Sequence, residues 1–185
     1  MKQESTFKYI LRLTATLLAI CAVVALALAG VNAITKDKIA AVKAEKTAAA
    51  ISAVLKNGET AVEVPYSTEG NTNVSKVYKN ENGYAVEVSP SGFGGAIAMM
   101  VGIDNEGKVT GISIISHAET PGLGAVAAAN TDKGTAFRDQ FAGLVSGITI
   151  GGGENQIDAL SGATISSQAI VDGVNEALSC VAGLG

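Results

Sequence analysis

The sequence predicts an α+β fold, in which an antiparallel sheet packs against helices behind an N-terminal transmembrane helix. Three observations lead to this prediction. A long uncharged apolar segment lies near the N-terminus, several short alternating segments separated by turns follow it, and an amphipathic segment with the period of a helix comes after them. The 185 residues are enough for one domain with an appendage.

The apolar segment, residues 13–35, contains no charged residue and consists mainly of Leu, Ala, Val and Ile. At about 1.5 Å per residue, a helix of this length crosses a hydrocarbon core of about 30 Å. A cleaved signal peptide is the alternative, because Ala27-Leu28-Ala29 has the small residues of a cleavage site. Signal sequences have shorter apolar regions, however, of about 7 to 15 residues. We therefore expect a retained anchor that follows a short segment, residues 1–12. Basic residues flank the anchor at both ends, so charge does not decide its orientation.

Residues 36–58 are predicted to form a helical stalk, because they are rich in Ala and Lys and end in Asn57-Gly58. Their weak apolar stripe indicates packing on the edge of the following domain. Residues 59–73 contain proline, glycine and small polar residues, which predicts a short strand and a loop.

Four strands are predicted next, and their turn sequences are short. The predicted strands are residues 74–79, 84–89, 96–103 and 109–115. The third strand is apolar except for Gly102, as expected of a central strand buried on both faces. Consecutive strands joined by short turns indicate an antiparallel sheet.

The last third of the sequence predicts two small helices, at residues 125–130 and 134–142, and a strand at 148–150. A longer helix begins near Thr164, with Ser161 as its expected N-cap. Its apolar stripe consists of Ile165, Ala169, Ile170, Val174, Ala177, Leu178 and Val181.

Composition excludes several classes of function. From Lys36 onward the chain has 10 basic and 16 acidic residues, and the whole chain has one histidine and no tryptophan, so no nucleic-acid partner is expected. Cys21 and Cys180 have no metal-ligand spacing around them, so we expect no metal site. The Gly92–Gly95 cluster lacks both the G-x-G-x-x-G spacing and a Walker A lysine, which excludes an ATPase motif.

The stretch from Asp158 to Ser167 places a hydroxyl, Thr164, at the start of the last helix. Backbone N–H groups in a first helical turn have no helical partners, and they favour a phosphate together with the helix dipole. No carboxylate occurs in the seven residues after Thr164. The alternative is an ordinary first-turn threonine in a helix that is simply capped.

The segment from His117 to Gly124 also interrupts the strand pattern. Thr120-Pro121-Gly122 sets a turn, since proline fixes φ and glycine permits positive φ. His117 and Glu119 lie at the exit of a strand, where loops often carry function. A solvated histidine and glutamate are the alternative, and no catalytic triad or carboxylate pair is evident.

Together, H-A-E-T-P-G-L-G at 117–124 and D-A-L-S-G-A-T at 158–164 resemble the FMN-binding domain of bacterial membrane electron-transport complexes. The resemblance is greatest to the G subunit of Rnf-type ion-translocating ferredoxin:NAD oxidoreductases. The C subunit of sodium-translocating NADH:quinone reductase is a relative that is generally longer. The transmembrane helix and the chain length are similar too.

The resemblance implies that a flavin transferase joins FMN through its phosphate to Thr164. It implies further cofactor-binding residues in the two motifs and near the glycine loop that contains Phe93. These are Ser161, Gly162, Ala163, Glu119, Thr120, Pro121, Gly122 and Leu123. We expect Thr120 to hydrogen-bond the edge of the isoalloxazine ring and Leu123 to pack on it. The transferase is expected to recognise Asp158, Ser161, Gly162, Ala163 and Thr164.

The implied function is electron relay through covalent FMN in a complex that couples ferredoxin:NAD electron transfer to ion translocation. The implied partners are the other subunits of that complex, the transferase during maturation, and the membrane. Residues 1–12 are then cytoplasmic, and residues 59–185 form an FMN-binding domain on the extracytoplasmic face. No catalytic site of the chain's own is expected. The alternatives are a stand-alone extracytoplasmic flavin-dependent reductase and a flavin-free anchored binding module.

Overall fold

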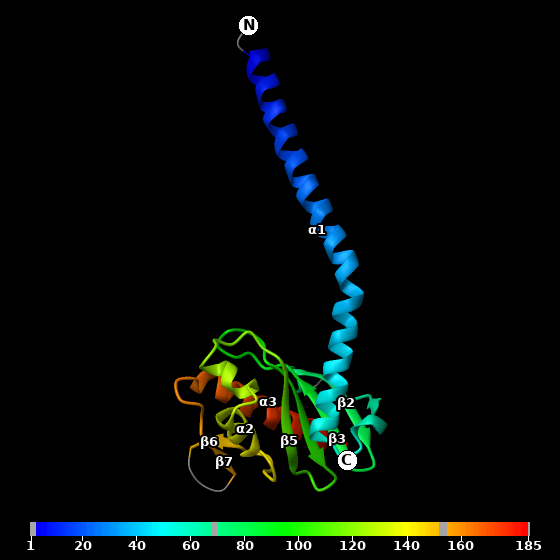
Figure 1. Cartoon of the computed structure of the whole chain (residues 1–185), viewed down its shortest axis with the longest axis vertical. Helices are drawn as coiled ribbons and strands as arrows, with labels where there is room; N and C mark the ends of the chain where they lie inside the picture. Colours follow the sequence, from blue (N-terminus) through cyan, green and yellow to red (C-terminus); the bar gives the residue numbers. More distant parts are fainter. Residues whose placement is uncertain (1–2, 68–69, 152–154, 185) are drawn as a thin grey trace. The chain divides into compact units, whose positions relative to one another are not determined.

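Five antiparallel strands form a meander in which every strand pairs with its neighbour in sequence (Figure 1). The strands are β1 (Val62–Val64), β2 (Val74–Asn80), β3 (Gly83–Val88), β4 (Ala98–Asp104) and β5 (Val109–Ser116). The computed structural model describes residues 3–67, 70–151 and 155–184. The predicted N-terminal segment and the loop before β2 therefore lie partly outside the described residues.

The predicted fold class and all four predicted strands are confirmed, with ends that differ by at most two residues. The strand expected from residue 96 begins at Ala98, because Ala96 instead forms an isolated bridge with Ser91. The Gly92 N–H also donates to the Gly95 carbonyl, 2.8 Å away, which closes this loop on itself.

The main core lies between one face of the sheet and α3 (Thr164–Ala182). Tyr84, Val86 and Val88 alternate along β3 and face this core. The helix contributes Ile170, Val174 and Ala177, each fully buried, as the predicted stripe required. One member of that stripe is wrong, since Ile165 is 58% exposed.

Shorter elements close the end of this core. They are η2 (Gly124–Ala128), α2 (Asp132–Asp139), β6 (Thr149–Ile150) and β7 (Gln156–Ile157). Phe137 and Phe141 stack edge to face with ring centroids 5.6 Å apart. The helix predicted at 125–130 is a 3₁₀ turn, and the strand predicted at 148–150 pairs in parallel with β7, which the sequence did not predict.

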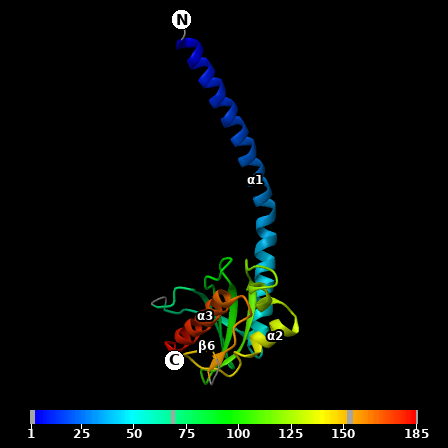
Figure 2. The ribbon, with the colours of Figure 1, turned by 90° about the vertical axis from the view of Figure 1, so that its left-hand side faces the viewer.

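The opposite face of the sheet is covered by the last turns of α1 (Gln3–Val54), as Figure 2 shows. Ala50, Ile51 and Val54 form a second apolar cluster there with Ala85 and Met100. The predicted stalk helix is confirmed as helix as far as Val54, but its end packs on the face of the sheet rather than on its edge. Two-sided coverage explains why every residue of β3 is buried.

One helix among the described residues is long and apolar enough to cross a bilayer. It covers Phe7–Val54, and its most apolar 18-residue window has a mean hydropathy of 2.6 with no residue buried. The helix contains residues 13–35, the predicted anchor, and is consistent with a single pass.

Cys180 provides a test of the core at alkaline pH. Its side chain is buried on α3, and this burial, with a smaller contribution from Glu176, raises the pKa of the thiol above its ordinary value. The thiol of the unfolded chain therefore ionises first, so the free energy of unfolding is retained below about pH 8.5 and falls above it. Urea unfolding across this range should show the fall, and C180A should show a smaller one. An equal fall in both proteins would contradict this assignment.

Candidate functional site

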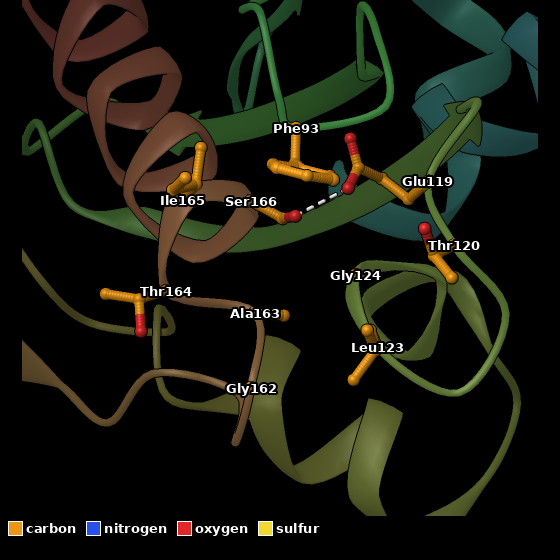
Figure 3. Close-up of a pocket in the computed structure, with 10 residues that line it drawn as sticks. All are labelled: Phe93, Glu119, Thr120, Leu123, Gly124, Gly162, Ala163, Thr164, Ile165 and Ser166. Carbon is orange, nitrogen blue, oxygen red and sulfur yellow. Dashed lines mark hydrogen bonds between the residues drawn. The ribbon is translucent and has the colours of Figure 1, made fainter.

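A pocket of about 360 Å³ lies where three separate segments of the chain meet (Figure 3). One segment is the glycine loop after β3, the second is the 117–124 turn after β5, and the third is the start of α3. A volume of this size is in the range of small-molecule sites. The lining residues are Phe93, Glu119, Thr120, Leu123, Gly124, Gly162, Ala163, Thr164, Ile165 and Ser166.

The start of α3 differs from the prediction. The helix begins at Thr164, its cap position is Ala163, and no side chain caps it, so the expected N-cap role of Ser161 is wrong. Ser161 lies two residues before the cap, and the turn through Gly162, with φ of 73°, separates it from the first helical N–H groups. Ser167 instead organises this turn, since its Oγ accepts from the Leu160 N–H and donates to the Ala163 carbonyl, both at 3.0 Å.

The uncapped helix start leaves backbone donors free beside Thr164. Among the described residues, none accepts a hydrogen bond from the N–H groups of Thr164, Ile165 or Ser166. Thr164 itself is exposed, and its side chain points away from the centre of the pocket (Figure 3). This arrangement presents a hydroxyl next to donors and a dipole that both favour a phosphate.

The 117–124 turn holds one buried carboxylate. Glu119 is only 6% exposed, whereas His117 is exposed and accepts a hydrogen bond at Nδ1 from the Glu119 N–H, 3.2 Å away. The Thr120 carbonyl accepts from the N–H groups of Leu123 and Ala125, which closes the turn. Of the two alternatives for this segment, solvation therefore fits His117 but not Glu119.

The Glu119 carboxylate contacts both other segments of the pocket. Its Oε1 accepts a hydrogen bond from the Gly94 N–H at 2.9 Å, and its Oε2 accepts one from the Ser166 hydroxyl at 2.5 Å (Figure 3). Sequence reasoning missed Ser166, although a signal is present. The residue lies four positions before Ile170, in phase with the buried face of the helix.

Apolar side chains form the rim of the pocket. Phe93, Leu123 and Ile165 come from the three different segments and are 71%, 43% and 58% exposed. Large apolar groups that remain this exposed around one opening favour a planar apolar ligand. The periodicity of the last helix predicts a core position for Ile165, so its contribution to this rim does not follow from the sequence.

The other expected site residues are placed as follows. Thr120, Gly162 and Ala163 line the pocket, while Ser161, Pro121 and Gly122 are exposed beside it without lining it. The side chain of Asp158 is exposed as well. Its backbone N–H donates to Gln140 Oε1 at 2.7 Å, and the Gln140 amide donates weakly to its carbonyl at 3.4 Å. Among the described residues, no group of three or more His, Cys, Asp or Glu side chains is placed to hold a metal ion.

Comparison with known families gives one matching model, the FMN-binding domain, over residues 92–179. This range contains every residue that lines the pocket. The uncapped helix start, the exposed hydroxyl and the apolar rim fit such a cofactor, which has a phosphate at one end and a planar ring at the other.

Three curated proteins are similar to the chain, and each is the G subunit of an oxidoreductase complex. That of the Na⁺-translocating ferredoxin:NAD⁺ oxidoreductase complex of Acetobacterium woodii is 32% identical over 94% of this chain and 92% of its own. That of the ion-translocating oxidoreductase complex of Methanosarcina acetivorans is 34% identical over 96% and 97%. That of the proton-translocating ferredoxin:NAD⁺ oxidoreductase complex of Clostridium ljungdahlii is 41% identical, but the match spans 51% of each chain, about half of that protein's length.

Proposed function

This chain belongs to the family of G subunits of ion-translocating ferredoxin:NAD⁺ oxidoreductase complexes, and we propose that it relays electrons there through FMN joined covalently to Thr164. As a G subunit it is part of a multi-subunit oxidoreductase, with an FMN-binding domain and an N-terminal apolar helix suited to a single-pass anchor. The covalent bond, the relay and the membrane face belong to the proposal.

One observation carries the proposal. Thr164 presents an exposed hydroxyl at an uncapped helix start, on the wall of the pocket. A phosphate ester at this hydroxyl keeps one negative charge, which the free N–H groups of the first turn stabilise. The bound FMN supplies the electron transfer, while the protein sets its position and electrostatic surroundings.

The walls of the pocket support the expected roles of its other residues. Leu123 and Phe93 offer apolar surface for the faces of the isoalloxazine ring, and Ile165 does so on the helix side. Thr120 offers a hydroxyl at the opposite side of the pocket from Thr164 (Figure 3). A phosphate held at Thr164 thus leaves the interior of the pocket to the ring system.

Exposure of the attachment motif supports recognition by a flavin transferase. Asp158, Ser161, Gly162 and Thr164 are all exposed, whereas Ala163 is buried. We propose that the transferase reads the exposed members directly and that Gln140, by binding both backbone polar groups of Asp158, holds the start of the motif in place.

We also propose that the domain lies on the extracytoplasmic face of the membrane, with residues 1–12 in the cytoplasm. A covalent bond prevents loss of FMN by dilution outside the cell, and the anchor keeps the flavin at a high effective concentration beside its partner subunits. Both features suit a relay that receives and delivers electrons within one complex.

The proposal is tested with the full-length chain, produced in membranes together with its partner subunits and a flavin transferase. Denaturing electrophoresis should show flavin fluorescence on this chain, and its mass should exceed that of the polypeptide by FMN less one water. In the intact complex, reduced ferredoxin should bleach this flavin, whereas the isolated chain should not reduce soluble acceptors with NADH. A chain without flavin would favour an anchored binding module, and acceptor reduction by the isolated chain would favour a stand-alone reductase.

A further inference from the structure

The carboxylate of Glu119 is the point at which the three segments of the pocket are joined. Its own segment is the 117–124 turn, Gly94 belongs to the glycine loop, and Ser166 belongs to the first turn of α3. Within residues 92–97, 117–124 and 161–167, all of which the structure describes, these are the hydrogen bonds that connect one segment to another. The shape of the pocket therefore depends on one buried side chain.

Two glycines leave the space that this carboxylate needs. A Cβ on Gly92 would overlap Glu119 Oε1 and lie 2.7 Å from Ile97 Cδ1. A Cβ on Gly124 would overlap Oε2 and lie 2.5 Å from Ser166 Oγ. Glycines on both sides of the carboxylate show that the backbone closes around it as tightly as sterics permit.

Glu119 is also the one charged side chain among the residues that line the pocket. Its two oxygens accept from two donors, which is the pattern in which a carboxylate is held in a protein. The surrounding wall is largely apolar, so a charge here is weakly screened and acts strongly on a neighbouring group. A ligand that gains negative charge in this pocket is destabilised by it.

We propose that Glu119 is a positioning residue that fixes the pocket walls against the flavin and whose negative charge disfavours addition of electrons to the ring, lowering the reduction potential of FMN. The inference rests on the proposed function, because it requires FMN in this pocket. Ser166 and Gly94 act through Glu119 by holding its carboxylate against the pocket wall.

Two substitutions separate the charge from the connection. In E119Q the side chain keeps its length, since the amide oxygen can accept from Gly94 and the amide nitrogen can donate to Ser166 Oγ, but the charge is lost. In E119D the charge remains but the side chain is one methylene too short to bridge both partners.

Glu176 supplies a matched control on the same helix. Its two oxygens accept hydrogen bonds from the Asn73 N–H and the Asn73 side-chain amide, both at 2.7 Å. It lies ten residues after Ser166, about 15 Å along the helix axis, and does not line the pocket. E176Q therefore changes a comparable carboxylate pair without changing the charge beside the proposed flavin.

The full-length variants are produced with a flavin transferase, and three quantities are measured: covalent flavin on denaturing gels, the midpoint potential of the attached flavin, and its visible absorption spectrum. E119Q should retain the flavin and shift the potential upward, while E176Q should leave the potential unchanged. E119D should keep a potential closer to the parent than E119Q does and should alter the flavin spectrum. An unchanged potential in flavinylated E119Q overturns the electrostatic role, and an unchanged spectrum in E119D overturns the positioning role. If the parent chain itself carries no flavin, the proposed function fails instead.

Discussion

Replacing Thr164 by alanine is expected to abolish covalent flavin on this chain. The substitution removes the hydroxyl that would form the phosphoester, whereas its effect on folding should be small, within about 0.5 kcal/mol, because the side chain is exposed at a helix start where alanine is well tolerated. In-gel flavin fluorescence after denaturation, with intact mass, measures the outcome. T164S keeps a hydroxyl at the same position and should retain part or all of the flavin.

T120A is the matched control for this substitution. Thr120 is also exposed and also lines the pocket, so T120A removes a hydroxyl from the same cavity without touching the attachment point. The variant should keep its covalent flavin. Fluorescence that survives denaturation in T164A would show that the flavin is attached elsewhere, and its loss from both variants would point to the pocket as a whole.

Substitution of Gly102 by valine is expected to cause the largest loss of stability. Gly102 lies in β4 beneath the end of α1, and a Cβ there would overlap the Val54 carbonyl oxygen and lie 2.9 Å from its carbon. The same carbonyl accepts a hydrogen bond from the Thr110 hydroxyl, so the helix end cannot move away without losing it. We expect a loss of about 3 kcal/mol or more, since overpacking against backbone is not relieved by side-chain rotation. Thermal unfolding should show a melting temperature lower by about 10 °C.

Gly111 offers a control directly across the ladder. It pairs with Gly102 in β5, yet a Cβ on Gly111 has no atom within 4 Å. G111V should therefore be tolerated and should gain from the preference of valine for strands. Equal destabilisation by both substitutions would mean that loss of glycine in the strands, rather than contact with α1, causes the effect.

The sheet and the last helix were predictable because their signals are local. Alternation along residues 84–89, turn sequences between strands and a stripe of helical period each report on a few neighbouring residues, and the structure confirms them. The expectation that α1 packs on the edge of the domain was wrong because a weak apolar stripe does not say which surface it covers. That surface depends on Ala85 and Met100 in distant strands.

The site was predictable in its motifs but not in its connections. Thr164 and the 117–124 turn could be singled out from their residues, and the structure brings both segments to one pocket. The burial of Glu119 and its bond to Ser166 join residues 47 positions apart, which no local pattern encodes. Ser161 resembles an N-cap in sequence, but the positive φ of Gly162 moves the helix start beyond it.

The order of the elements along the chain has a consequence for biogenesis. The sheet consists of neighbours in sequence and can form as its hairpins leave the ribosome or the membrane, but α3 follows every strand and supplies the wall of the pocket that bears Thr164. The pocket is therefore completed only when the last helix docks. Attachment of FMN would then be a late step of maturation, and flavinylated protein would mark chains whose domain has finished folding.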